Sequence, residues 1–267
     1  MTSATAAVLS TPELLEALFL ECDIRNVLTS VQRVCRQWRG IVVSSPAVQA
    51  HLYLRPESKS KSKGKGKGKG KKSPTLNPLL AEVFAPFFAP FVINTSEGFW
   101  GRAEISALPL AGHPGPFMRE DATWRAMHVQ QPPLRALGVV MPSESYSIVY
   151  EQEREAIRMG ELYDHVVRML TNPGQRWRIL WREAASLRTR TTLLDEFNAE
   201  CTRDLLAEVD VVLVRSSDPW RSLSILPSDR DFMAKFTHPA VLRSRKLDLT
   251  PPTRVRGRMS RREQREL

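Results

Sequence analysis

Residues 58–73 alternate lysine first with serine and then with glycine, and this segment limits where the chain can build a hydrophobic core. It has no large apolar side chain to bury, and its like charges keep it extended. Its charge comes from a run of eight lysines: Lys59, Lys61, Lys63, Lys65, Lys67, Lys69, Lys71 and Lys72. We therefore predict a disordered linker over residues 56–74, with folded segments on either side.

Residues 9–55, before this linker, contain three short amphipathic segments. Thr11 suits the N-cap of a first helix, Pro12 suits its first turn, and Glu13 meets the positive end of its dipole. In the second segment hydrophobic residues recur with helical spacing, which predicts one continuous helix. These residues are Val27, Leu28, Val31, Val34, Cys35 and Trp38. Ser45–Pro46 begins a third short helix, so the pattern predicts a compact three-helix unit.

A unit of about 45 residues is near the lower size limit for independent folding, so something must compensate for its small core. Cys22, Cys35 and Cys201 are the only cysteines, and no Cys/His spacing is typical of a zinc site. Because Cys35 lies on the apolar stripe, we interpret it as a small hydrophobic residue. We expect another protein to cover the remaining apolar surface. The alternative is a helical hairpin that belongs to the main core.

Segments 11–17, 27–39 and 44–49 together resemble an F-box domain of the fungal type, with a Pro-x-x-Leu opening and a Val-Cys-x-x-Trp closing. The resemblance implies docking onto a Skp-family adaptor, and through it onto a cullin and a RING subunit, in an SCF ubiquitin ligase. It also implies two sets of residues. The adaptor-facing set is Pro12, Leu14, Leu15, Leu18 and Leu28. The set that packs the helices together is Val31, Val34, Cys35 and Trp38.

The net charge of +10 invites a nucleic-acid interpretation, but the basic residues are unevenly distributed. The linker and residues 241–267 together carry more than this net charge, so the rest of the chain is acidic on balance. We expect residues 228–267 to be a basic, largely disordered tail. The linker can act as an inert spacer, as a nuclear-localisation signal or as a non-specific phosphate-binding segment, and the sequence leaves these alternatives open.

Residues 75–227 are predicted to form an α+β domain. Helices are expected at 122–129, 159–170 and 192–207, and strands at 176–182 and 209–214. Repeated prolines in the aromatic segment 84–91 argue against a regular helix there. Its aromatic side chains either pack onto the core or form an exposed Pro/Phe ligand motif.

The same domain carries a second resemblance. The motifs are Trp124-Arg125-x-Met127, Gln130–Pro133 and Met159–Asp164. They are similar to the region that follows the F-box in a group of uncharacterised filamentous-fungal F-box proteins. This resemblance implies no chemistry.

Catalytic motifs are lacking, and we predict neither an enzyme nor a cofactor or metal site. Four histidines follow the linker, and none lies in a catalytic motif: His113, His128, His165 and His238. Glu151–Glu155 and the Asp164–His165 pair are interpreted as solvated helix or loop surface rather than acid–base groups.

No apolar run reaches the length of a membrane span, so no membrane association is expected. Residues 1–20 lack the basic region of a signal peptide and carry acidic residues in their apolar part. With so few cysteines, we expect a cytoplasmic or nuclear location.

The sequence therefore predicts an α+β protein: a three-helix F-box joined by a Lys/Gly/Ser linker to a small mixed C-terminal domain. The function we expect is that of a ligase substrate receptor that recruits an unknown protein target through residues 75–227. The alternative is a nuclear or nucleic-acid-associated scaffold protein that uses the basic linker and tail.

Overall fold

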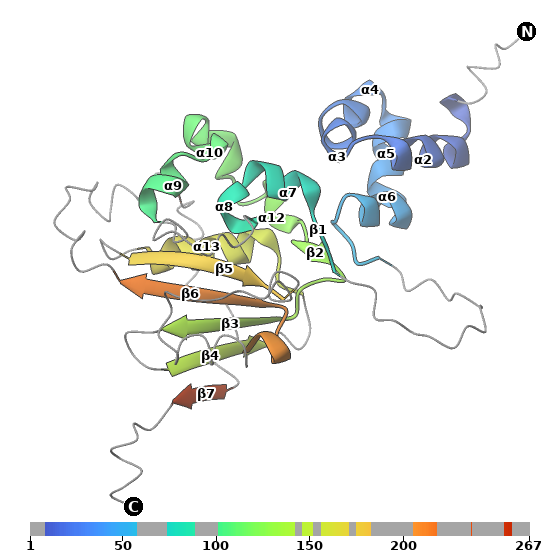
Figure 1. The fold of residues 1–267 in the computed structure, drawn as a ribbon. Helices are drawn as coiled ribbons and strands as arrows, with labels where there is room; N and C mark the ends of the chain where they lie inside the picture. The colour runs from blue at the N-terminus through green and yellow to red at the C-terminus, as the bar shows by residue number, and fades with distance from the viewer. Residues whose placement is uncertain are drawn as a thin grey trace, which may run out of the picture. The chain divides into compact units, whose positions relative to one another are not determined.

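The computed structural model describes residues 9–57, 74–88, 101–141, 146–151, 156–170, 175–182, 205–217, 236 and 254–257 (Figure 1). Within these residues the chain mixes helix and strand, which confirms the predicted α+β class. The chain divides into two compact units. Unit 1 comprises residues 1–79 and 127–133, and unit 2 comprises residues 80–126 and 134–267.

Unit 1 begins with α2 (Pro12–Glu21), which forms where the first helix was predicted. Thr11 has extended backbone at the N-cap position, and Pro12 lies in the first turn. The other helices of the unit are α3 (Ile24–Asn26), η1 (Val27–Val31), α4 (Gln32–Val34), α5 (Arg36–Ser44) and α6 (Pro46–His51). The third predicted helix is α6, and the Ser45 hydroxyl caps it by accepting from the backbone N–H of Val48 at 3.1 Å.

The second predicted helix is interrupted, which corrects the sequence prediction. The η1 segment is a π-helix, in which one turn holds more residues than a turn of α-helix. At Cys35 the backbone is extended, with φ −159° and ψ 170°, so α4 ends there and α5 begins as a separate helix. The period of 3.6 residues therefore does not run through Cys35. One continuous apolar stripe from Val27 to Trp38 does not form.

Two segments distant in sequence complete unit 1. Strand β1 (Thr75–Leu76) pairs antiparallel with β2 (Gln130–Gln131), and Thr75 lies opposite Gln131. The Gln131 side chain also contacts the end of the helical region. Its Nε2 donates to the carbonyl of Arg55 at 2.9 Å, and its Oε1 accepts from the backbone N–H of Glu57 at 2.9 Å. Unit 1 is therefore larger than the predicted 9–55 segment.

Buried polar groups hold these segments together. The backbone N–H of His128 donates to the carbonyl of Tyr53 at 2.7 Å. Asn77 is fully buried, and its Nδ2 donates to the carbonyl of His128 at 3.3 Å. We call the contacts among residues 53–57, 75–77 and 128–131 the seam of unit 1. Because a buried amide without partners would cost free energy, Asn77 favours this one arrangement of the seam.

The lysine-rich segment 58–73 lies outside the described residues, but the residues on both of its sides are described. Glu57 before it and Thr75 after it both contact Gln131. Both flanks belong to unit 1, and the boundary between the units falls after Leu79. The segment therefore connects two parts of unit 1, whereas we had predicted a linker between two domains.

Helix α7 (Pro78–Val83) crosses the boundary into unit 2. The other helices of unit 2 for which bounds are described are short, apart from α13. They are α8 (Ala85–Phe88), α9 (Arg102–Ser106), α10 (Pro109–Gly112), α11 (Pro114–Phe117), α12 (Thr123–Ala126) and α13 (Met159–Met169). The helix predicted at 159–170 is confirmed as α13. The helix predicted at 122–129 is confirmed only as the single turn α12.

A five-stranded sheet forms the centre of unit 2, in the order β5-β6-β3-β4-β7. Its strands are β3 (Ala136–Met141), β4 (Tyr146–Glu151), β5 (Gln175–Trp181), β6 (Val211–Ser217) and β7 (Arg254–Gly257). Strands β3 and β6 are parallel, whereas the pairs β3–β4, β5–β6 and β4–β7 are antiparallel (Figure 1). The sheet is therefore mixed.

The two predicted strands are confirmed as β5 and β6, and β6 lies inside the sheet as expected. Strands β3, β4 and β7 were not predicted, and β7 corrects the expectation of a largely disordered tail at that point. Most of the helix predicted at 192–207 lies outside the described residues, although residues 205–208 are helical.

Aromatic side chains fill the core between the short helices and the sheet. The ring of Phe87 lies 4.7 Å from that of Trp177, and the ring of Phe88 stacks on Trp181 at 5.4 Å between centroids. Phe84 lies 4.8 Å from Trp124. All six are buried, so the described part of the aromatic segment, residues 84–88, packs onto the core as one alternative predicted. Its prolines do not prevent the helical turn α8, because Pro86 occupies the first turn.

A second hydrophobic cluster contains side chains of β3 and β6 and of the turn of helix at 205–208. Its members are Val140, Leu205, Leu206, Val209, Val212 and Val214. Gly138 of β3 belongs to the same region, because a Cβ there would meet Val212 Cγ2 at 3.2 Å and Val209 Cγ2 at 3.3 Å. The glycine allows this close packing inside a strand.

Candidate partner-binding surface

Helix α2 has a buried side and an exposed side. Leu15 and Phe19 are fully buried, and they lie one turn apart on the side that faces the core of unit 1. Leu14 and Leu18 are also one turn apart, and they are 47% and 44% exposed. The helix therefore presents two leucines to solvent beside a core that is already complete.

Of the five residues expected to face an adaptor, the structure exposes Pro12, Leu14 and Leu18, and Leu28 is half-buried. The prediction that Leu15 faces the adaptor is corrected, because its side chain lies in the core. Sequence spacing did not distinguish Leu14 from Leu15, since both fall within the broad apolar part of α2.

The residues expected to pack the helices together also divide. Val31 is buried, and half-buried Trp38 packs edge-on against Phe19 with 5.3 Å between ring centroids. Val34 is 59% exposed and Cys35 is exposed, which corrects our prediction for both. The physical reason is the backbone break at Cys35, which removes both side chains from the apolar stripe.

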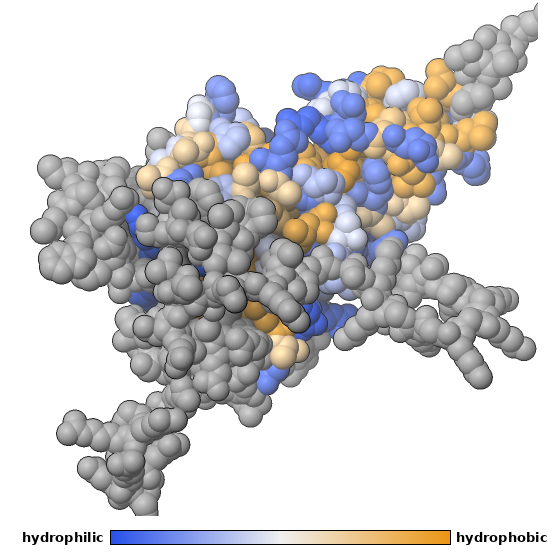
Figure 2. All heavy atoms as spheres, viewed as in Figure 1, coloured by the Kyte–Doolittle hydropathy of each residue, from blue (hydrophilic) through white to orange (hydrophobic). Residues whose placement is uncertain are grey.

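Exposed apolar surface is concentrated in unit 1. Among the described residues, the large hydrophobic side chains that remain most exposed are Leu9, Leu14, Leu18, Val34 and Val43. All belong to unit 1, and Figure 2 shows hydrophobic side chains at the surface over α2 and α4. Exposed apolar groups that gather in one region of a protein mark interaction sites.

Charge is also divided within unit 1. Residues 9–23 carry Glu13, Glu16, Glu21 and Asp23 and no basic residue. Residues 24–54 carry Arg25, Arg33, Arg36 and Arg39 and no acidic residue. The α2 end of the unit is therefore acidic, and the segment from α3 to α6 is basic.

A groove lies on the basic segment, and the sequence prediction did not single it out. Its volume is about 390 Å³, and it is lined by Leu28, Thr29, Gln32, Arg33 and Arg39. Only Leu28 belongs to the predicted adaptor-facing set. The acid-free run of residues 24–54 is the signal that could have identified this basic surface.

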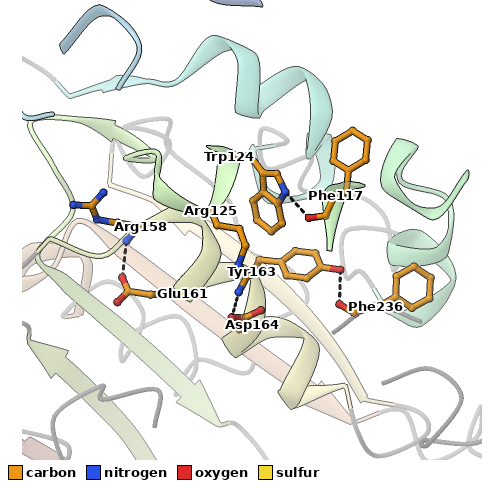
Figure 3. Close-up of polar contacts among 8 residues, drawn as sticks. All are labelled: Phe117, Trp124, Arg125, Arg158, Glu161, Tyr163, Asp164 and Phe236. Atoms are coloured by element: carbon orange, nitrogen blue, oxygen red, sulfur yellow. Dashed lines mark hydrogen bonds and ion pairs between the residues drawn. The ribbon is translucent and has the colours of Figure 1, made fainter. Parts of the chain in front are cut away.

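The candidate acid–base residues of unit 2 have structural roles. Asp164 pairs with Arg125, and both side chains are about 90% buried (Figure 3). We had expected Asp164 on the helix surface, and its burial corrects that expectation. Burial raises the pKa of the Asp164 carboxyl, while the adjacent Arg125 guanidinium opposes this shift. Burial also lowers the pKa of His165 to about 4, so its imidazole is neutral at pH 7.

Figure 3 shows further contacts that stabilise the same region. The Glu161 carboxylate accepts from the backbone N–H of Arg158 at 2.7 Å and so caps α13. The Tyr163 hydroxyl donates to the carbonyl of Phe236 at 3.1 Å. These hydrogen bonds fix helix α13 in the core of unit 2.

Of the other candidate groups, the structure describes two histidines. His113 is exposed, His128 is buried in the seam of unit 1, and His238 lies outside the described residues, as do residues 152–155. In the part of the chain that the structure describes, no group of three or more His, Cys, Asp or Glu residues is arranged to hold a metal ion.

Comparisons with known proteins add no assignment. The chain matches no family model, no curated protein and no solved structure. None of its described helices is both long enough and apolar enough to span a membrane.

Proposed function

We propose that this chain is a substrate-receptor subunit of an SCF-type ubiquitin ligase and that its N-terminal helices are an F-box. Unit 1 then binds a Skp-family adaptor and, through it, the cullin and RING subunits, while unit 2 recruits a protein target. The receptor needs no catalytic residue or cofactor. Holding the target near the charged ubiquitin-conjugating enzyme raises its effective concentration. Such a receptor acts in the cytoplasm or the nucleus.

The exposed side of α2 carries this proposal. Leu14 and Leu18 lie together in solvent although Leu15 and Phe19 already fill the core beneath them. Burying the exposed part of each leucine against a partner would contribute about 1 kcal/mol. The sequence motifs that resemble an F-box lie on these same helices, and they supply the identity of the partner.

Co-purification with a Skp-family adaptor tests the proposal. We expect the full-length chain to retain the adaptor and the double variant Leu14→Asp/Leu18→Asp to lose it, because two buried unpaired carboxylates would oppose the contact. Leu15 must stay unchanged, since a charge in the core would unfold unit 1.

Val43→Asp is the matched control, because Val43 is 64% exposed and lies on α5 outside the predicted adaptor-facing set. Retention of the adaptor by this variant separates the α2 surface from a general effect of added charge. If the full-length chain does not retain the adaptor at all, the proposal fails.

A further inference from the structure

The groove on the basic segment of unit 1 has two walls, which come from different helices. It is lined by residues of η1 and α4, which precede the backbone break at Cys35, and by Arg39 of α5, which follows it. Along the chain, the backbone break at Cys35 lies between the two walls. A π-helical turn is rare in proteins and is frequent at functional sites.

Among the described residues, no carboxylate pairs with the arginines of the groove. Arg33 and Arg39 are both exposed, and neither forms an ion pair with a carboxylate that the structure describes. No acidic residue occurs anywhere in residues 24–54. An arginine guanidinium offers a planar fork of donors that matches a carboxylate, so two arginines at one groove favour an anionic occupant.

The other residues that line the groove limit which groups of a ligand it can bind. The Thr29 hydroxyl donates to the carbonyl of Arg25 at 2.8 Å, and the Gln32 amide lies 3.5 Å from the carbonyl of Leu28. Both polar side chains are thus engaged within their own helical turns. Half-buried Leu28 adds an apolar side chain to the lining.

From these observations we infer that the groove binds an acidic segment of a partner protein. Carboxylates of the segment pair with Arg33 and Arg39, and an apolar side chain beside them contacts Leu28. This interaction goes beyond the proposed adaptor binding, which depends on Leu14 and Leu18 of α2. The two surfaces share only Leu28, so an experiment that leaves Leu28 unchanged keeps them distinct.

Fluorescence anisotropy with a labelled peptide of sequence Glu-Glu-Leu-Glu-Glu tests the inference. The protein is the full-length chain in which the eight lysines of residues 59–72 are changed to glutamine, so that this segment cannot attract the probe. We expect saturable binding at about 0.15 M salt. The peptide Gln-Gln-Leu-Gln-Gln should not bind, because it lacks the charges that the arginines recognise.

The decisive comparison uses two double variants with the same change in charge. Arg33→Glu/Arg39→Glu should weaken binding of the acidic peptide about tenfold or more, because charge reversal leaves two repulsive contacts. Arg25→Glu/Arg36→Glu changes exposed arginines of the same unit that do not line the groove, and it should have little effect. Circular dichroism checks that both variants fold.

Several outcomes would overturn the inference. These are an equal loss in both double variants, no binding by the parent chain, and equal binding of the glutamine peptide. Self-association that only Arg33→Glu/Arg39→Glu abolishes, without peptide binding, would instead assign the groove to a second copy of the chain. Adaptor co-purification in the same proteins reports separately on the proposed function.

Discussion

Two adjacent leucines of α2, Leu14 and Leu15, differ in burial, and substitutions can test this difference. Leu15 is fully buried, whereas 47% of Leu14 is exposed. Their order along the chain gives no hint of this, because only the direction of each side chain around the helix decides it.

Truncation of each leucine should therefore have different effects on stability. Leu15→Ala should destabilise unit 1 by about 2–5 kcal/mol through the loss of core packing. Leu14→Ala should change its stability by less than about 0.5 kcal/mol. Hydrogen exchange of the α2 amides in the native protein measures both effects. Equal protection in the two variants would contradict the assigned orientation of α2.

Gly160 packs so closely against Arg125 within unit 2 that a side chain at this position would clash. A Cβ at this position would lie 2.9 Å from the Arg125 Cβ and 3.0 Å from the Arg125 carbonyl oxygen. Gly160→Ala should therefore destabilise unit 2 by about 1–3 kcal/mol, measured by denaturant unfolding. Gly112→Ala is the matched control, because nothing lies within 4 Å of the Cβ it would add. A destabilisation no larger than that of the control would contradict the described packing.

The buried imidazole of His165 predicts a dependence of stability on pH. Burial lowers its pKa to about 4 in the folded state, against 6.5 for an imidazole exposed to water. Below pH 6.5 the unfolded chain therefore takes up a proton that the folded chain does not. The stability from this group is complete above pH 6.5 and falls as the pH drops towards 4, by about 3 kcal/mol in all.

Comparison with His165→Gln isolates this contribution, because Asp164 titrates with the opposite sign. Its folded pKa is raised, so its ionisation reduces stability as the pH rises through that value. The unfolding free energy of the wild-type chain should fall more steeply between pH 6.5 and pH 4 than that of the variant. Identical pH profiles would show that the imidazole is not desolvated.

At the scale of elements, the seam of unit 1 holds both ends of segment 58–73, so the length of this segment is not constrained by the fold. Glu57 and Thr75 both contact Gln131, so the two ends of the segment are anchored by one residue. Its length therefore does not have to match any distance between the units.

Replacing residues 59–72 by a short Gly/Ser loop should change the stability of unit 1 by no more than about 1 kcal/mol, since loop closure depends weakly on loop length. Gln131→Ala should cost more, about 1–3 kcal/mol, because the backbone groups of Arg55 and Glu57 lose their partner. Denaturant unfolding of both variants checks this order. Unfolding of unit 1 on loop replacement alone would contradict it.

The elements that were predicted correctly are those with strong local signals. Helix α13 has a clear apolar period, and β5 alternates its apolar residues. Strand β3 was missed because Gly138 weakens a strand signal, and only the packing of Val212 and Val209 explains the glycine. The seam was missed because Gln131 acts through contacts with residues 76 positions earlier in the chain.

The candidate surface was predicted only in part, because only some of its features have a local signal in the sequence. Motif and period identified α2. The F-box resemblance assigned Leu14 and Leu18 to its surface, where the structure exposes them, but it assigned the buried Leu15 to the same surface. They failed at Val34 and Cys35, because no local signal in the sequence announces the extended backbone at Cys35. The groove depends on that break, so the sequence could indicate its charge but not its shape.

At the scale of the whole molecule, the two units differ in what they expose and what they bury. Unit 1 gathers the exposed apolar side chains of the described residues and divides its charge between an acidic α2 end and a basic groove. The described core of unit 2 holds buried aromatic side chains and the buried Arg125–Asp164 pair. Under the proposed function, contacts with the ligase begin on α2.

Site-specific photo-crosslinking can show whether the adaptor contacts α2. A photoreactive amino acid replaces Leu18 in the full-length chain, and a matched protein carries it in place of Val43. In the presence of a Skp-family adaptor, the account predicts a covalent product with the adaptor from position 18 and little from position 43. A product from position 43 alone, or from neither position while adaptor is present in excess, would contradict the claim that α2 is the adaptor-binding surface.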